Sequence, residues 1–307
     1  MSRRNNKQLK VVFLGGVGEI GKNMTAIEYG DNILIVDCGG MFATYETPGV
    51  DLITPDFSYI DENADKVKGV VLTHGHEDHI GGLPYLVKDR LDKVKIYGSD
   101  LTLALVKHKF KEHGIDSPKF VPVKGGETRT IGCFEVEFVT VTHSISGAYA
   151  IAVRTPVGVI FLTGDFKVDY TPIDGESIDL PRLAQIGDEG VKLMLGESTN
   201  IEREGFTMSE RKVGETIERI VESNADSRII IATFASNVNR IQQIINICQK
   251  YRRKVAFNGR SMKNISEIAV KLGIMKADNG TIVDIEDIRK FAPGSSASSR
   301  RGRRASQ

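Results

Sequence analysis

The sequence has little cysteine, no long apolar run and almost no net charge. Its three cysteines, Cys38, Cys133 and Cys248, lie far apart in the 307 residues and form no CxxC pair, which excludes a disulfide framework and a zinc knuckle. No stretch approaches the roughly 18 apolar residues that a membrane span needs. The charged start MSRRNNKQLK is not followed by the apolar segment of a secretory signal. We therefore expect a cytoplasmic protein with reduced thiols and no membrane partner.

The formal charge of +1 hides an uneven distribution. The last fourteen residues, GSSASSRRGRRASQ, hold four arginines and no acid, so the preceding 293 residues carry 37 basic against 40 acidic groups, a charge of −3. A slightly acidic body argues against a basic shell that coats duplex nucleic acid, although it leaves room for a local basic groove.

Short apolar runs broken by Gly and Asp fill the sequence as far as about residue 200, and they predict strands and hairpins with few helices. Near residue 208 the pattern changes: helical stretches alternate with RIIIATFAS, predicted as a buried strand, and KVAFNG, which is typical of a parallel sheet. From residue 294 the composition is Ser, Gly and Arg, which predicts disorder. We therefore predict three segments, 1–207, 208–292 and 293–307.

The stretch FLGGVGEIGKN contains a literal GxGxxG at residues 16–21, and Asp37 follows sixteen residues after Gly21. A dinucleotide-binding fingerprint requires a helix that opens on the third glycine. Here the following KNMTAIEYGDNILIVDCG is typical of a β-hairpin, so we expect no nucleotide cofactor. The glycines instead let a loop between two strands approach a cleft closely, near a substrate phosphate.

The stretch LTHGHEDHIGG places His74, His76, Asp78 and His79 directly after an apolar strand. In extended backbone His74 and His76 point the same way and can reach one ion. Asp78 and His79 follow as the chain turns and can reach a second ion about 3.5–4 Å away. Imidazole and carboxylate ligands without a thiolate are typical of Zn²⁺ or Mn²⁺ in a catalytic site. The alternative is a solvated histidine-rich turn.

Two further residues at predicted strand ends favour the metal interpretation. His143 in VTVTHSI would complete a three-histidine site with His74 and His76, and Asp165 in FLTGDFK would bridge both ions. Taken singly, each residue is more often a hydrogen-bonded surface group. In company with the histidine-rich stretch, we expect both to be ligands.

An HxHxDH motif followed by a lone His and a lone Asp at strand ends resembles the metallo-β-lactamase superfamily. Further stretches are similar to ribonuclease J of the β-CASP branch over about residues 9–292, among them VDCGGMF, TGDFKVDYTPIDG, GESTNIEREGFTMSE, TFASNVNRIQQII and FNGRSM. The resemblance implies an α+β fold: an αββα metallo-β-lactamase sandwich over 1–207, then an incomplete α/β β-CASP domain over 208–292 and a basic tail.

The resemblance also implies the roles of individual residues. Two Zn²⁺ ions would be held by the following side chains: His74, His76 and His143 for one, and Asp78, His79 and Asp165 for the other. Asp37 would orient a ligand histidine, and Glu197 in GESTN would open the β-CASP segment. Asp78 or Asp165 would manage the proton of the attacking water, and Ser144 would hold phosphate oxygens.

The implied activity is hydrolysis of RNA phosphodiester bonds in RNA maturation and decay, as a 5′-to-3′ exonuclease, an endonuclease or both. Single-stranded RNA would be the substrate, and a second copy or a paralogous ribonuclease J the protein partner. The sequence departs from the family after residue 143, because none of its six histidines lies beyond that position. The family has a last ligand histidine and a histidine-containing phosphate pocket in that region.

We therefore expect a C-terminally truncated chain with two Zn²⁺ sites, the second of which lacks one ligand of the family. A basic RNA-binding arm is the alternative reading of the tail. Two other functions stay open. The same metal centre suits hydrolysis of a small ester, lactam or thioester, and the missing histidine suits an inactive fragment that binds RNA or a partner.

Overall fold

The computed structural model describes residues 8–116, 119–173 and 176–301. Backbone contacts divide the chain into two compact units. The first comprises residues up to 141 together with 147–166 and 179–201, and the second comprises 142–146, 167–178 and the chain from 202 onward. The predicted segments 1–207 and 208–292 follow chain order, whereas these units follow contacts, so the predicted boundaries stay a prediction.

The first unit contains a six-stranded sheet in the order β1-β2-β3-β6-β7-β8. Its strands are β1 (Leu9–Gly15), β2 (Met24–Tyr29), β3 (Asn32–Val36), β6 (Val67–Val71), β7 (Lys95–Gly98) and β8 (Lys119–Pro122). β1, β2 and β3 pair antiparallel, so a hairpin follows the glycine loop as predicted. β3, β6, β7 and β8 pair parallel. The two short strands β4 (Met41–Phe42) and β5 (Leu52–Ile53) pair with each other.

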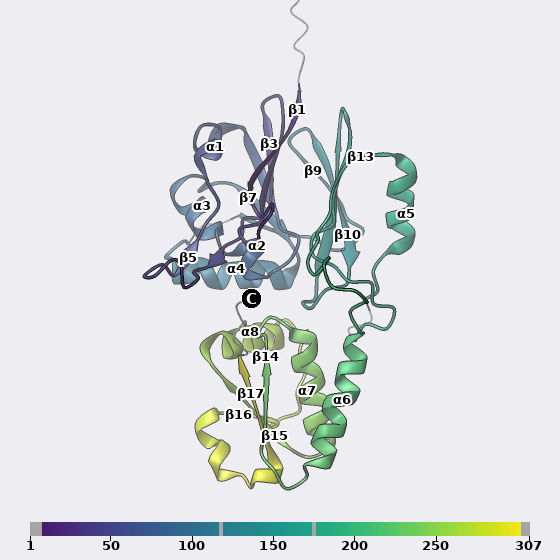
Figure 1. Cartoon of the computed structure of the whole chain (residues 1–307). Helices are drawn as coiled ribbons and strands as arrows, with labels where there is room; N and C mark the ends of the chain where they lie inside the picture. The colour runs from purple at the N-terminus through teal and green to yellow at the C-terminus, as the bar shows by residue number, and fades with distance from the viewer. Residues whose placement is uncertain (1–7, 117–118, 174–175, 302–307) are drawn as a thin grey trace, which may run out of the picture. The chain divides into compact units, whose positions relative to one another are not determined.

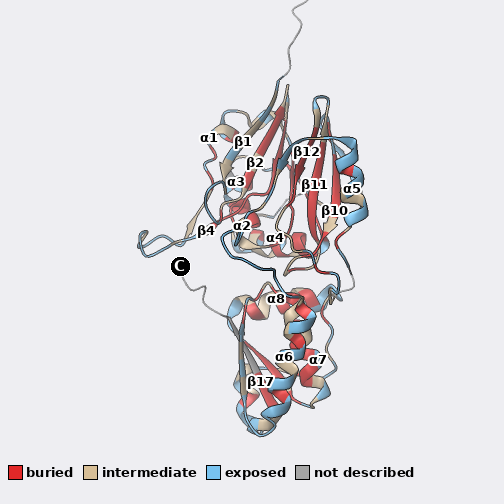
Figure 2. Ribbon diagram, turned by 45° about the vertical axis from the view of Figure 1, so that its right-hand side comes forward, coloured by how far each residue is buried: buried red, intermediate tan, exposed pale blue. Residues whose placement is uncertain are grey.

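A five-stranded sheet in the order β13-β12-β11-β10-β9 faces the first sheet. Its strands are β9 (Thr128–Ile131), β10 (Phe134–Val141), β11 (Ala148–Thr155), β12 (Gly158–Leu162) and β13 (Val191–Leu195). Alternate residues of β10, namely Phe134, Val136 and Phe138, pack against Leu34 and Val71 of the other sheet in one apolar core. The inner strands of both sheets, such as β3, β10 and β11, are accordingly buried along much of their length (Figure 2).

Helices cover the outer faces of the two sheets, which gives four layers in the order αββα (Figure 1). The helices on the side of the six-stranded sheet are α1 (Ser58–Asp61), α3 (Leu83–Asp89) and α4 (Asp100–Glu112), and α5 (Leu180–Glu189) lies beside the five-stranded sheet. Two short elements, η1 (Ala64–Lys66) and α2 (Glu77–Ile80), flank β6. Ser99 caps α4 by accepting a hydrogen bond from the Thr102 N–H, as its position before the helix predicts.

The second unit is built on a parallel sheet in the order β14-β17-β15-β16. Its elements in chain order are α6 (Glu210–Ser223), β14 (Ile229–Thr233), α7 (Val238–Lys250), β15 (Lys254–Asn258), α8 (Arg260–Lys271), β16 (Ile282–Val283), η2 (Ile285–Lys290), η3 (Pro293–Ser295) and β17 (Ser296–Arg301). Helix α7 packs against α6 and β15. The predicted strand–helix alternation is therefore confirmed, since parallel neighbours need crossover connections.

Two details of this unit differ from the predictions. β14 is not a buried strand: it lies at the edge of the sheet, and Ile230 is 68% exposed. The prediction of disorder from residue 293 is wrong for β17, which pairs with β14 on one side and β15 on the other. Backbone hydrogen bonds to two neighbours specify a central strand even where the composition is Ser and Arg. Residues 302–307 of the predicted tail lie outside the described residues.

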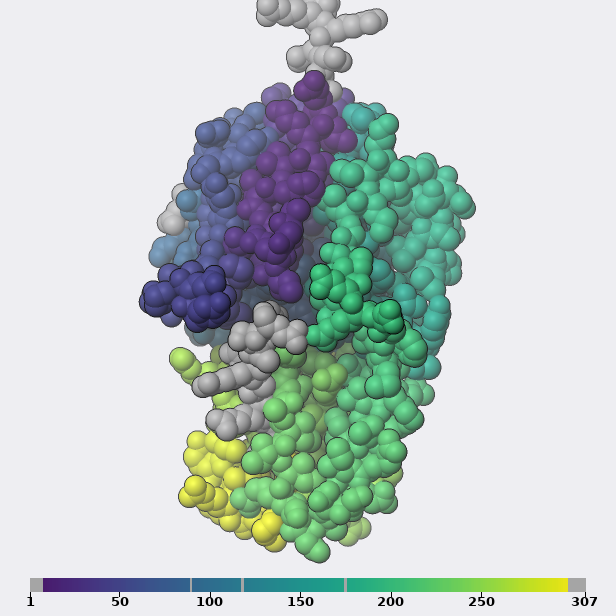
Figure 3. Space-filling model, viewed as in Figure 1, coloured from purple at the N-terminus to yellow at the C-terminus, as the bar shows by residue number. Residues whose placement is uncertain are grey.

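The segment 41–53 around β4 and β5 projects from the surface of the first unit (dark blue in Figure 3). Three large apolar side chains are exposed there, Phe42, Tyr45 and Val50. In the part of the chain that the structure describes, no helix is long and apolar enough to cross a membrane.

Candidate metal centre

The candidate site forms where strands of both sheets end. β3 and β6 are parallel neighbours, so the residues that follow them, Asp37 and Thr73, lie at the same edge of the sheet. The Asp37 N–H donates to the Val71 carbonyl at 2.8 Å. β10 and β12 both run antiparallel to β11, so they end on the same side and place His143 and Asp165 at one edge. The Tyr149 N–H donates to the Thr73 carbonyl at 2.9 Å and joins the two sheets here.

Three histidines form the first group of ligand atoms. His74 follows the end of β6, and His76 stands in extended backbone directly before α2. Nε2 of His74 lies 3.0 Å from Nδ1 of His76. Ring nitrogens of His74, His76 and His143 all lie within 4.8 Å of one another. The structure thus brings together the three histidines that the sequence predicted for one ion.

A second group shares His74 with the first and adds His79 and Asp165, again with ligand atoms within 4.8 Å of one another. His79 is on the short helix α2, and its Nε2 lies 3.4 Å from Oδ1 of Asp165 and 3.8 Å from Oδ2 of Asp78. Because all the residues predicted for the second ion lie around this imidazole, the two groups together form one polar centre with a shared histidine.

Asp37 fixes the orientation of the His79 ring through a contact with Nδ1 of that ring. Its Oδ2 lies 2.8 Å from Nδ1 of His79 and accepts the Thr73 hydroxyl at 2.8 Å, while its Oδ1 accepts the Thr73 N–H at 2.8 Å. Asp37 has a φ of 59°, a left-handed conformation that Asp adopts more readily than most residues. Burial alone would lower the pKa of His79, but the carboxylates of Asp37 and Asp165 outweigh it and hold that pKa well above its ordinary value.

The residues present fit a pair of divalent metal ions. Two nitrogens bound to one tetrahedral Zn²⁺ at 2.0–2.1 Å would lie about 3.3 Å apart, close to the 3.0 Å between His74 and His76. The second group combines imidazole with carboxylate, which is a ligand set for Zn²⁺ or Mn²⁺. Carboxylate oxygens of Asp37 and Asp165 lie 2.8 and 3.4 Å from the two ring nitrogens of His79, so the negative charge that a cation would balance is already placed here.

Besides Asp37, two residues outside the ligand groups, Glu197 and Asn23, hold the site together, and Asn23 was not predicted from the sequence. Glu197, after β13, accepts the Phe166 N–H at 3.3 Å and so braces the loop next to Asp165. Asn23 ends the glycine loop; its side-chain amide donates to the Asp78 carbonyl at 3.0 Å and lies 3.2 Å from Nε2 of His79. Asn23 belongs to the quoted glycine stretch, but nothing in its spacing distinguishes it there.

The glycines after β3 permit this close approach. A Cβ on Gly39 would lie 1.6 Å from the Asp78 carbonyl oxygen, so only glycine fits. The chain at 38–40 runs along α2, with the Cys38 N–H donating to the His79 carbonyl at 2.9 Å.

Ser144, predicted to bind substrate, follows His143 and is half-buried.

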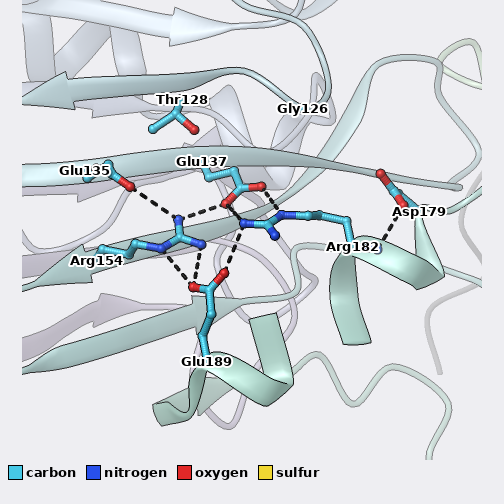
Figure 4. Close-up of a pocket in the computed structure, with 8 residues that line it drawn as sticks. All are labelled: Gly126, Thr128, Glu135, Glu137, Arg154, Asp179, Arg182 and Glu189. Carbon is cyan, nitrogen blue, oxygen red and sulfur yellow. Dashed lines mark hydrogen bonds and ion pairs between the residues drawn. The ribbon is translucent and has the colours of Figure 1, made fainter. Parts of the chain in front are cut away.

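A second charged cluster lies elsewhere in the first unit and has a different character. Arg154 and Arg182 join β11 and α5 through Glu137 and Glu189 (Figure 4). Nε of Arg182 donates to Glu137 at 2.6 Å, and the Arg154 guanidinium donates to both glutamates. These groups line an open cleft of about 460 Å³. Because the guanidinium and carboxylate charges pair with one another, this cluster is a structural ion-pair network.

Comparison with known proteins identifies the family to which this fold belongs. The metallo-beta-lactamase superfamily model matches residues 17–199, which is more than half of the chain. The chain belongs to the metallo-beta-lactamase superfamily. A second model, "Ribonuclease J, beta-CASP domain", matches residues 226–297 in the second unit. The predicted fold class, a metallo-β-lactamase sandwich followed by a β-CASP segment, is confirmed.

Several curated relatives of this superfamily member are named Ribonuclease J. The protein from Corynebacterium glutamicum is 47% identical over 285 residues, covering 93% of this chain and 39% of that protein. The one from Mycobacterium tuberculosis is 46% identical, covering 93% and 50%. Ribonuclease J2 from Bacillus subtilis is 39% identical over 295 residues, covering 95% and 52%. The chain spans about half the length of these relatives, and its predicted resemblance to ribonuclease J is confirmed.

A solved structure shows the same fold at low sequence identity. A protein of unknown function from Enterococcus faecalis V583 matches with a TM-score of 0.67 and 16% identity, covering 96% of this chain and 77% of the other. The superfamily fold implies divalent metal binding, and the two groups around His74 are the candidate ligands for it.

Proposed function

We propose that this chain is a Zn²⁺-dependent ribonuclease that hydrolyses phosphodiester bonds of single-stranded RNA in the cytoplasm. The observation that carries the proposal is that His79 and Asp165 converge at the strand ends with the three histidines His74, His76 and His143. The β-CASP match in the same chain favours RNA over a small ester, lactam or thioester.

In this proposal one Zn²⁺ is held by His74, His76 and His143, and the other by Asp78, His79 and Asp165. When bound, the ions supply Lewis acidity and lower the pKa of a coordinated water toward neutrality. Because the two ligand groups lie at one place, ions held there would act on one phosphodiester.

The protein's own groups then have distinct tasks. Asp37 keeps the proton of His79 on Nδ1, which leaves Nε2, on the side of Asp165, as the nitrogen that would bind an ion. Asp78 or Asp165 accepts the proton of the attacking water. Glu197 holds the loop that carries Asp165 through the Phe166 N–H. The Ser144 hydroxyl donates to a phosphate oxygen, which neutralises developing charge.

The test combines metal analysis with cleavage of 5′-monophosphorylated single-stranded RNA. We expect about two Zn²⁺ per chain, as the two-ion chemistry requires, and RNA cleavage that His76→Ala abolishes. His108→Ala is the matched control, because His108 lies on α4 beside Glu112 and in neither ligand group. Metal binding together with β-lactam or thioester hydrolysis, and no RNA cleavage, would favour the small-substrate hydrolase instead.

The mode of cleavage has its own test. A circular RNA has no 5′ end, so its cleavage requires an endonuclease, whereas loss of 5′-terminal nucleotides from a linear RNA indicates a 5′-to-3′ exonuclease. RNA binding without cleavage of either substrate would favour a non-catalytic binding fragment. Light scattering of the same sample would detect self-association, the second partner that the resemblance implies.

A further inference from the structure

We infer that Lys167 is a positioning residue for the metal centre. Through Lys167, the first turns of α6 and α7 hold the two segments that carry His143 and Asp165. The inference rests on the proposed function, and it concerns residues outside both ligand groups. Lys167 lies two residues after Asp165 and belongs to the second unit, as does the segment 142–146.

The backbone of Lys167 is paired with the segment that carries His143. Its N–H donates to the Thr142 carbonyl at 2.8 Å, and the Thr142 hydroxyl donates to the Lys167 carbonyl. This isolated antiparallel bridge joins residue 142, next to one ligand, to residue 167, two residues from the other. A shift of either segment therefore displaces its partner.

The side chain of Lys167 points to two buried carboxylates. Nζ lies 3.5 Å from Asp169 and 3.7 Å from Glu210, and these acids are 4% and 8% exposed. Asp169 also accepts the Glu210 N–H at 3.3 Å, at the start of α6. Removing the lysine charge would leave the buried Asp169 carboxylate with N–H donors but without its paired cation, which is costly.

The first turn of α7 completes the connection. Arg240 forms a two-pronged pair with Glu210, at 2.7 and 3.1 Å. The preceding residue, Asn239, accepts the Ser146 hydroxyl at 3.0 Å, so the segment that carries His143 is attached to α7 as well. Because Arg and carboxylate meet in a fixed bidentate geometry, the starts of α6 and α7 and the two segments form one connected polar network.

The test compares two variants that each remove an ion pair in the second unit. Lys167→Met keeps the length of the side chain and removes its charge. Glu218→Gln is the matched control: it removes the α6–α7 ion pair with Lys250, far along both helices from residue 167. Zn²⁺ affinity is measured by competition with a chromophoric chelator, and ligand geometry by the visible spectrum of the Co²⁺-substituted protein.

We expect Lys167→Met to weaken Zn²⁺ binding about tenfold, the lower end of the effect seen when groups behind metal ligands are removed, and to alter the Co²⁺ spectrum. Lys167→Arg should restore both, and Glu218→Gln should change neither. Unchanged Zn²⁺ affinity and an unchanged spectrum in a folded Lys167→Met variant overturn the inference. So does an equal loss of affinity in the Glu218→Gln control.

A second variant keeps the inference testable if Lys167→Met does not fold. Thr142→Val removes the hydroxyl that donates to Lys167 and leaves the ion pairs in place; it should also weaken Zn²⁺ binding, and wild-type affinity in this variant refutes the inference. Failure of the proposed function would give a different result from failure of this inference. In that case the wild-type chain itself lacks Zn²⁺ or RNA cleavage, whatever the variants do.

Discussion

Neutralising Asp37 gives the sharpest test of how the metal centre is built. The carboxylate accepts from the Thr73 N–H, the Thr73 hydroxyl and Nδ1 of His79, each at 2.8 Å. Asn has the same shape and tolerates a φ of 59°, so Asp37→Asn changes the charge and hydrogen bonding with little backbone strain. Its amide has only one acceptor oxygen, so at least one buried donor loses its partner.

The size of the effect follows from these contacts. A buried donor without a partner costs about 1–3 kcal/mol of stability. Removing a group that orients a ligand histidine costs roughly 10- to 100-fold in metal affinity. Since each tenfold is worth about 1.4 kcal/mol, the stabilisation that Zn²⁺ confers at a fixed concentration above its Kd should fall by about 1.4–2.7 kcal/mol.

The assay is urea unfolding of the variant with and without Zn²⁺, together with chelator competition. Glu137→Gln is the control, because it also neutralises a buried carboxylate in the first unit, one held by Arg154 and Arg182 and in neither ligand group. Both variants should lose stability without metal, but only Asp37→Asn should lose Zn²⁺ affinity. If Asp37→Asn binds Zn²⁺ as tightly as wild type, or if both variants lose affinity equally, the assigned role of Asp37 is wrong.

Gly39→Ala should be destabilised by more than about 3 kcal/mol in urea unfolding, because its Cβ would lie 1.6 Å from the Asp78 carbonyl; wild-type stability would contradict the backbone packing described here. Ser209→Ala should lose about 0.5–2 kcal/mol, since Ser209 caps α6, and the same unfolding curve measures it. The Arg182 hydrogen bond lowers the pKa of Glu137 below its ordinary value of 4.5. The stability that it contributes is therefore present above pH 4.5 and lost as the pH falls through the lowered pKa. Arg182→Gln should flatten this acid limb of the stability–pH curve, and an unchanged limb would show that the pair does not contribute.

The sequence could predict which candidate ligand residues come together because their signal is local. HxHxDH places four candidate ligand side chains within six residues after an apolar strand, and strand ends of one sheet meet at one edge. Lys167, Asp169 and Glu210 give no such signal: they are common residue types, and only the folded chain brings them together. Asn23 was missed for the same reason, since its contact with His79 spans 56 residues.

Composition misled the prediction at two places in the second unit. Ile230 stands in a continuous apolar run, which predicts burial, but its strand is at the edge of the sheet and the side chain is exposed. Ser and Arg at 296–301 predict disorder, yet this segment pairs with strands on both sides. Position in a sheet depends on which strands become neighbours, and this information is not contained in the local pattern.

The place of β17 in the sheet has a consequence for the order of folding during synthesis. β17 comes last among the strands in chain order but lies between β14 and β15, which do not pair with each other. The sheets of the first unit are complete once the ribosome has released residue 195. The sheet of the second unit can be completed only after residues 296–301 have been synthesised, when α6, α7 and α8 have already been made. Until then β14 has no described partner strand, and its exposed edge is open to pairing with another chain.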